Sequence, residues 1–276
     1  MLQIPRKPVF LSNGKQYIEA NYQNMKDIKL NHKLITRMLF VLSIALVSAR
    51  AAAQTKDHLA IQFEEPSDIF TESEKQLAVE LLTDSEREVR KLLPGLPEGI
   101  EVNVEIVDWD LDVVGGVTGR AETNDPPVVM IQVSKKFPGG VEAAINGGLQ
   151  SVIYHEFHHL SLGWAVRDNQ FTSDIQTATV IEGLAEVFSE VFTGVSHAEN
   201  QMPQEVNAED WIEEVRALPK DADYQTWMFQ HPDGRTSIGY RTGNYLIKQA
   251  LSNSGKTILE LSRLSPGELW ALAGYN

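Results

Sequence analysis

The sequence predicts an α+β fold in which a small mixed or antiparallel sheet in the N-terminal half packs on a central helix, and the C-terminal half is mainly helical. Two observations predict the sheet. Residues 100–106 alternate between apolar and polar side chains, and residues 128–133 form a short apolar run. One observation predicts the helices: apolar residues recur at intervals of three and four along 141–160 and again in several later segments.

Residues 1–53 are expected to be an N-terminal extension that ends in a signal peptide. Basic residues precede an apolar run over 38–47, and mostly small residues follow up to residue 53. A membrane span needs about 20 apolar residues, which is twice the length of this run, so we expect cleavage and no stable membrane anchor. Because the basic region lies far from Met1, Met25 is the expected true start. The product is then exported, to the periplasm or out of the cell.

The remaining residues, 54–276, are expected to form a single domain with a strongly acidic balance. The extension holds eight of the 24 Lys and Arg residues and two of the 38 Asp and Glu residues, so the rest of the chain has a net charge of −20. That charge argues against nucleic acid and anionic lipid as partners. The absence of cysteine excludes disulfides, a thiol nucleophile and a thiolate-ligated metal. The sequence leaves the oligomeric state open.

The elements before the predicted site alternate in type along the chain. Residues 54–66 are polar and predict an irregular segment, whereas Thr71 and Glu74 form a capping box before a helical pattern that ends near Leu93. After the first strand, the glycines and prolines of 115–127 predict turns. Because proline cannot donate a ladder hydrogen bond, Pro126 and Pro127 argue against a central position for the start of the second strand.

The second half begins with a helical pattern from Val141. Gly147 and Gly148 weaken this helix in its middle, so the segment after them is expected either as its continuation or as a separate helix that begins near Leu149. Gly163 ends it. A polar loop, a helix closed by a glycine and further helical segments follow, and they are expected at 167–174, 177–192, 207–218, 236–251 and, in short pieces, 256–272.

The sequence from residue 155 reads H-E-x-x-H, a spacing that suits a metal ion. On a helix, residues four apart lie on one face, so His155 and His159 can reach the same cation. Glu156 is offset by roughly 100° around the axis, close enough to meet a water beside the metal. It is the expected general base. His158, three residues after His155, is an alternative ligand to His159, but Glu156 would then fit its role less well.

Two glutamates on the next predicted helix supply the missing ligand. Glu182 and Glu186 lie four residues apart among apolar neighbours, where carboxylates are costly to bury without a compensating cation. We expect Glu182 to be the third ligand and Glu186 to accept a hydrogen bond from the N–H of a ligand histidine, which fixes its tautomer. The alternative is that both glutamates are solvated on an amphipathic helix.

Together these motifs resemble the gluzincin metallopeptidases, in which a second acidic helix follows H-E-x-x-H. Over 106–250 the chain is also similar to a bacterial family of inferred zinc-dependent proteases that carry a domain of unknown function. The shared elements are HEFHH, EGLAE, the upstream Gly115–Arg120 and the downstream Gly239, Tyr240 and Gly243. The resemblance implies a zincin-like fold and one zinc ion per chain, with His155, His159 and Glu182 as ligands and Glu156 as the base.

The remaining parts of an active site are expected from less specific signals. Tyr240 is the preferred donor to the oxyanion of the transition state, with Tyr245, Arg241 and His231 as alternatives, although His231 is expected in a turn. Thr118–Arg120 either shape a cleft wall or form an ordinary turn.

Strand 128–133 has two alternative roles. In zincins an edge strand ahead of the active-site helix pairs with the substrate backbone, and this strand is placed to do so. Otherwise it is an ordinary core strand.

The sequence therefore favours an exported zinc-dependent metallopeptidase that acts on a peptide or protein substrate. Water activated by the metal would attack the peptide bond with the help of Glu156. Two other classes stay open: a non-catalytic zinc-binding protein that acts as an interaction module, and a di-iron carboxylate bundle. The bundle would need a second E-x-x-H, which does not follow Glu182 or Glu186.

Overall fold

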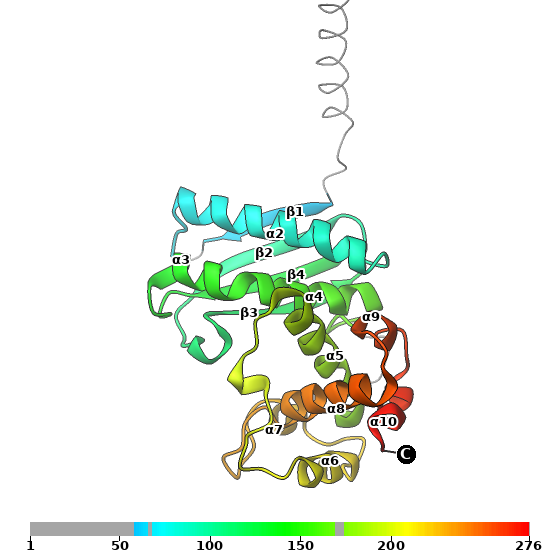
Figure 1. Ribbon diagram of the computed structural model, residues 1–276. Helices are drawn as coiled ribbons and strands as arrows, with labels where there is room; N and C mark the ends of the chain where they lie inside the picture. The colour runs from blue at the N-terminus through cyan, green and yellow to red at the C-terminus, as the bar shows by residue number, and fades with distance from the viewer. Residues whose placement is uncertain (1–57, 66–67, 169–173, 276) are drawn as a thin grey trace, which may run out of the picture. The chain divides into compact units, whose positions relative to one another are not determined.

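The computed structural model of the chain describes residues 58–65, 68–168 and 174–275, which belong to one compact unit, Asp57–Asn276. The α+β prediction is confirmed: a four-stranded mixed sheet precedes a mainly helical half (Figure 1). The expected signal peptide and the start at Met25 lie outside the described residues. None of the helices that the structure describes is long and apolar enough to cross a bilayer.

The sheet has the spatial order β1-β2-β4-β3. Its strands are β1 (Leu59–Glu64), β2 (Ile100–Val107), β3 (Val117–Asn124) and β4 (Pro127–Ser134). β1, β2 and β4 pair in parallel, whereas β3 runs antiparallel to β4 and forms one edge of the sheet. Helices α2 and α4 cover one face (Figure 1), so the buried core side chains of the sheet point toward them.

Two strands were not expected from the sequence. Residues 54–66 were predicted to be irregular, yet Leu59–Glu64 pairs with β2 from the Leu59–Ile100 pair onward. The glycine-rich stretch predicted as turns contains β3, and turns remain only at its two ends: at Gly115 and Gly116, which have φ of 77° and 84°, and at Asp125 and Pro126. Both predictions were wrong because pairing with a distant segment, rather than local propensity, makes these residues strands.

The start of β4 also differs from the prediction. β4 lies between β2 and β3, so Pro126 and Pro127 do not keep it at an edge. Pro127 pairs only with Asn124 of β3, and pairing with β2 begins at Val128, so no ladder hydrogen bond from proline is needed there. Of the two roles considered for strand 128–133, the core strand is therefore correct.

The helices on the sheet follow the predicted limits. α2 (Glu72–Leu92) starts with the expected capping box of Thr71 and Glu74. A short helix α3 (Gly140–Ala144) continues through a π-helical turn, Ile145–Leu149, into α4 (Gln150–Leu162), so the continuous alternative is correct. Gly163 caps α4 in the left-handed conformation, with φ of 73°.

The C-terminal half is built around α5 (Ile175–Thr193) and α8 (Ile238–Ser254). These helices cross very closely, since a Cβ atom on Gly183 would lie 2.3 Å from the carbonyl carbon of Gly243. Shorter helices complete this half, and they are α6 (Ala208–Arg216), α7 (Tyr224–Met228), α9 (Ile258–Leu261) and α10 (Pro266–Ala273). Only α7 among them was not predicted.

Candidate metal centre

Helix α4 directs two histidines toward α5. The Nε2 atoms of His155 and His159 lie 2.9 Å apart, and both side chains are buried. This proximity follows from the spacing of four residues, which places the two rings one turn apart on the same helix face. The pair is thus able to bind one ion with both imidazoles.

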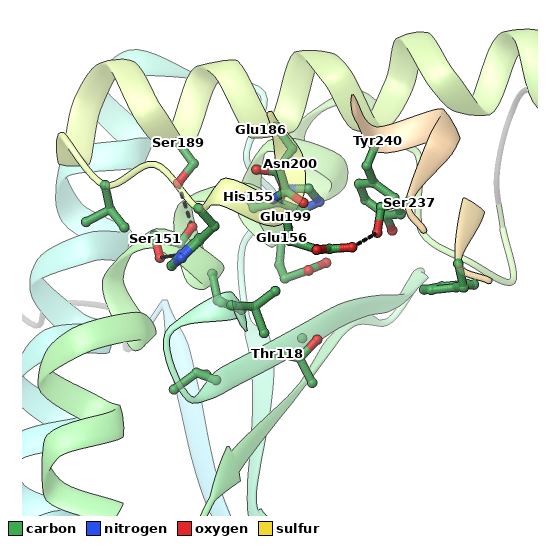
Figure 2. A pocket seen from close by; sticks show the side chains of 17 residues that line it. Thr118, Ser151, His155, Glu156, Glu186, Ser189, Glu199, Asn200, Ser237 and Tyr240 are labelled. Atoms are coloured by element: carbon green, nitrogen blue, oxygen red, sulfur yellow. Dashed lines mark hydrogen bonds and ion pairs between the residues drawn. The ribbon is translucent and has the colours of Figure 1, made fainter. Parts of the chain in front are cut away.

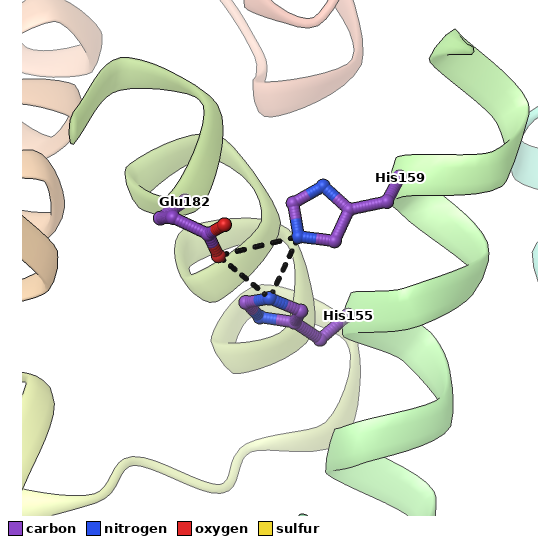
Figure 3. Close-up of side chains that lie close together, drawn as sticks. All are labelled: His155, His159 and Glu182. Carbon is purple, nitrogen blue, oxygen red and sulfur yellow. Dashed lines mark hydrogen bonds and ion pairs between the residues drawn. The ribbon is translucent and has the colours of Figure 1, made fainter. Parts of the chain in front are cut away.

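Glu182 of α5 completes the group (Figure 3). Its Oε2 atom lies 3.1 Å from Nε2 of His155 and 3.3 Å from Nε2 of His159. Tetrahedral zinc with ligands at about 2.0–2.2 Å places neighbouring ligand atoms roughly 3.3–3.6 Å apart, so the triangle needs only small adjustments to hold it. Within the described parts of the chain, these three side chains form the one group of three or more His, Asp or Glu residues found close enough to share an ion.

Glu186 lies one turn after Glu182 and contacts the other nitrogen of His155. Its Oε1 atom is 3.1 Å from Nδ1 of His155. A carboxylate in this position keeps the proton on Nδ1 and leaves Nε2 free to bind a metal. The side chains of Glu182 and Glu186 are only 13% and 14% exposed, so the alternative of two solvated glutamates is wrong.

The buried charges of this group interact strongly. Burial alone would lower the pKa of His155, but its contacts with Glu182 and Glu186 raise that pKa well above the ordinary value. Burial acts to raise the pKa of Glu182, yet His159 and His155 hold it well below the usual range. A carboxylate that stays ionised in the interior needs a positive partner, and a metal cation bound in the triangle would supply it.

Glu156 of α4 contacts β3. Its Oε2 atom accepts a hydrogen bond of 2.7 Å from the backbone N–H of Ala121, and the carboxylate is buried. Burial raises the pKa of Glu156, although His155 and His159 oppose the increase. A carboxylate with a raised pKa takes up and releases a proton near neutral pH more readily than an ordinary one.

A cavity of about 180 Å³ lies beside His155 and Glu156 (Figure 2). Thr118 and Gly119 of β3 line it, in agreement with a role in the cleft wall, whereas Arg120 contacts Glu122 instead. The opposite wall was not expected from the sequence. It comes from the segment after α5 and the start of α8, and it includes Val195, His197, Glu199, Asn200 and Ser237.

Glu199 is the charged residue of that unexpected wall. It accepts hydrogen bonds from Ser237 at 3.0 Å and from Arg241 at 2.8 Å. Burial acts to raise the pKa of Glu199, but the hydroxyls of Thr236 and Ser237 and the Arg241 guanidinium lower it overall. The sequence carried little signal for Glu199, because the surrounding Ser196–Asn200 is polar and shows no periodicity.

Tyr240 lines the cavity from the first turn of α8. Burial, followed by the nearby charge of Glu182, raises the pKa of its hydroxyl well above the ordinary value, so it stays protonated and able to donate. The alternatives to Tyr240 are placed differently. Arg241 is held by Glu199, Tyr245 is not among the cavity-lining residues, and His231 lies in the expected turn, beside Asp233.

His158 faces the core rather than the metal triangle. Its Nε2 atom lies 2.9 Å from the hydroxyl of Ser262, and burial lowers its pKa well below the ordinary value. The alternative in which His158 replaces His159 as a ligand is therefore wrong. His158 lies three residues after His155, and the two side chains therefore point in different directions. His155 lines the cavity, whereas His158 packs in the core.

The fold and the site define a class: an α+β protein whose H-E-x-x-H helix and neighbouring acidic helix form a candidate metal centre. A protein family described as "Predicted Zn-dependent protease (DUF2268)" matches residues 141–271. The matched stretch contains α4, α5 and α8, and with them both ligand histidines and Glu182. No curated protein and no solved structure matches the chain.

This similarity supports the expected resemblance to zinc-dependent proteases and, with the donor set of two imidazoles and a carboxylate, supports zinc as the metal. The match says nothing about the gluzincin type, which stays a prediction.

Proposed function

We propose that this protein is a zinc-dependent metallopeptidase of the gluzincin type, which hydrolyses peptide bonds with one zinc ion per chain. The observation that carries the proposal is the buried triangle of His155, His159 and Glu182 with Glu156 beside it and a cavity in front. His155, His159 and Glu182 would hold the ion, and Glu186 would orient His155.

In this proposal Glu156 carries out the proton transfers. Zinc, when bound, lowers the pKa of water to about 7 and polarises a carbonyl group. Glu156 takes the proton from the attacking water and delivers it to the nitrogen of the leaving amine. Its burial supports this role, because a raised pKa makes the carboxylate a better proton acceptor and the resulting acid is close enough to the cavity to donate.

Two further elements bind the substrate in this proposal. β3 is an edge strand beside Glu156, so an extended peptide can add to the sheet there through backbone hydrogen bonds. Tyr240, which keeps its hydroxyl proton, donates a hydrogen bond to the oxyanion that forms on the attacked carbonyl. The apolar and polar residues of the cavity would then contact the side chains around the scissile bond.

The place of action is proposed from the sequence alone. The signal-like residues 25–53 would direct the protein to the periplasm or out of the cell, and the acidic chain would act on peptides or proteins rather than on nucleic acid. After cleavage no stable membrane anchor is expected.

The variant Glu156→Gln tests the function most directly. It keeps the three ligands, so zinc content measured by elemental analysis should equal that of the wild type. Turnover of a fluorogenic peptide library should fall by about 10²- to 10⁴-fold, the usual contribution of a general base. Glu80→Gln on α2, exposed and remote from the cavity, is the matched control. Full turnover in Glu156→Gln would rule out the proposed base, and an inactive zinc-loaded wild type would favour a non-catalytic zinc protein.

A further inference from the structure

The described residues cover the free edge of β3 along only half of its length. In the C-terminal half, the N–H of Ala121 donates to Glu156, and the C=O of Ala121 accepts from Val166 N–H at 2.8 Å. The C=O of Glu122 accepts from Arg167 N–H at 3.0 Å. The backbone groups that this half would offer to an incoming strand are therefore already bonded.

Side-chain contacts hold the covering segment, Val166–Asp168, against β3. The carboxylate of Asp168 accepts the N–H of Asn124 at 2.9 Å, and its C=O accepts the amide of Asn124 at 3.2 Å. The guanidinium of Arg167 lies 3.2 Å from the carboxylate of Glu122. Together these contacts give the segment the role of a partner strand over Ala121–Asn124, a common way to protect an exposed sheet edge.

The N-terminal half of the same edge is open. Within the part of the chain that the structure describes, no group from outside the sheet hydrogen-bonds to the backbone of Gly119. Since residues two apart in a strand turn their N–H and C=O groups to the same side, those of Gly119 face the same edge as the N–H of Ala121. Val117, Thr118 and Gly119 line the cavity, and Ala121 does not.

Gly119 also brings this open half close to the catalytic helix. A Cβ atom there would lie 3.0 Å from Cγ of Glu156 and 2.8 Å from Cγ1 of Val152, so the absence of a side chain at Gly119 permits this close approach of strand and helix. A peptide that pairs with Gly119 thus lies directly beside Glu156.

We propose that substrate recognition is one-sided: the peptide backbone pairs with Val117–Gly119 on one side of the scissile bond, and Val166–Asp168 prevents such pairing on the other side. This inference rests on the proposed peptidase function. The substrate class is an extended peptide whose strand-forming residues all lie to one side of the cleaved bond, whereas the residues on the other side contribute little to binding.

A length series of peptides tests the asymmetry. Starting from a short cleaved peptide, one residue is added at a time on either side of the scissile bond, and kcat/KM is measured. Extension on the side that pairs with Val117–Gly119 should raise kcat/KM by roughly three- to tenfold for each backbone hydrogen bond gained. Extension on the side that Val166–Asp168 blocks should change kcat/KM less than twofold. Equal gains on both sides would overturn the one-sided model, whereas a wild type that cleaves no peptide would contradict the peptidase function itself.

The variant Asp168→Ala tests the covering segment. Loss of its carboxylate frees the N–H of Asn124, so kcat/KM should become sensitive to extension on the second side. Asp84→Ala, which removes an exposed carboxylate that binds Arg87 on α2, should keep the one-sided profile. An unchanged profile in Asp168→Ala would overturn the role assigned to the segment.

Amide hydrogen exchange gives a readout that does not depend on turnover. In zinc-loaded Glu156→Gln with a bound, uncleaved peptide, the amide of Gly119 should become protected from exchange. The amide of Asn124 should be protected with and without peptide. New protection at Asn124 on peptide binding, with none at Gly119, would overturn the proposal.

Discussion

Two walls of the cavity, besides the one formed by β3, are built in different ways. One wall consists of the faces of α4 and α5, where helix geometry sets the spacing of the functional side chains His155, His159, Glu182 and Glu186. The other wall consists of Val195–Asn200 and the first turn of α8, whose positions depend on polar contacts between distant segments. Of the three ligands, only His155 lines the cavity itself; His159 and Glu182 belong to the same two helices, and the second wall contains none of the ligands.

A single glutamate of intermediate burial holds the second wall in place. Glu190 of α5 contacts the segment through Ser196 and Gln201, and it contacts α8 through Asn244 and Lys248. Glu199 adds the contacts with Ser237 and Arg241 described above. The comparison therefore separates two properties: α4 and α5 should determine metal affinity, whereas the anchored segment should determine how substrate fits.

Removal of a ligand from the first wall should have the largest effect. Glu182→Gln leaves two histidines and no anionic ligand, so zinc affinity should fall by more than 100-fold, beyond the range of about 10- to 100-fold typical of residues that only orient a ligand. Glu186→Gln should stay within that range. Competition with a chelator measures both affinities, and circular dichroism checks the fold. Equal losses in the two variants would contradict the different roles of these glutamates.

The comparison of the two walls also explains which parts of the fold and the site the sequence could predict. His155, Glu156 and His159, and likewise Glu182 and Glu186, are spaced by helix periodicity, so local pattern alone brings each set to one face. The helix limits followed for the same reason, from signals such as the capping box of Thr71 and from Gly163.

The features that were missed depend on contacts between distant residues. β1 becomes a strand through pairing with Ile100–Glu105, and β3 becomes an edge strand through pairing with β4. Glu199 reaches the cavity because Arg241, 42 residues later, and Ser237 hold it there. No local periodicity marks these positions, so only the packed structure identifies them.

Gly183→Ala should have the next largest effect, because it disrupts the close contact between α8 and α5, a helix of the first wall. The added methyl group would lie 2.3 Å from the backbone of Gly243, so α5 and α8 must separate. Overpacking of this kind costs about 1–3 kcal/mol or more of unfolding free energy. Gly267→Ala, in the first turn of α10, where an added Cβ would have no neighbouring atom within 4 Å, is the matched control and should not destabilise. Urea unfolding measures the stability of both variants. If Gly183→Ala were as stable as Gly267→Ala, α5 and α8 would not cross as closely as described.

Glu190→Ala should affect the second wall and spare the first. The variant leaves Asn244, which is 1% exposed, without its acceptor, and an unsatisfied buried polar group costs about 1–3 kcal/mol. Zinc affinity should stay that of the wild type, while KM for peptides should rise. Glu72→Gln, a 96% exposed residue of α2, serves as control. A loss of zinc affinity in Glu190→Ala would show that the two walls are coupled.

The smallest effect is expected behind the second wall, where Glu214 of α6 binds the guanidinium of Arg235 in the turn before α8. The hydrogen bonds from Arg235 lower the pKa of Glu214, against a smaller opposing effect of burial. A carboxyl whose pKa is lower in the folded state stabilises the fold above its unfolded pKa of about 4.3, and this contribution disappears as the pH falls through the folded pKa. Glu214→Gln should therefore lower Tm slightly at pH 7 and by less at pH 3. Because Glu214 is partly exposed, added salt should also shrink the difference at pH 7. A difference in Tm that is constant between pH 7 and pH 3 would instead indicate that Glu214 stabilises the turn through packing alone.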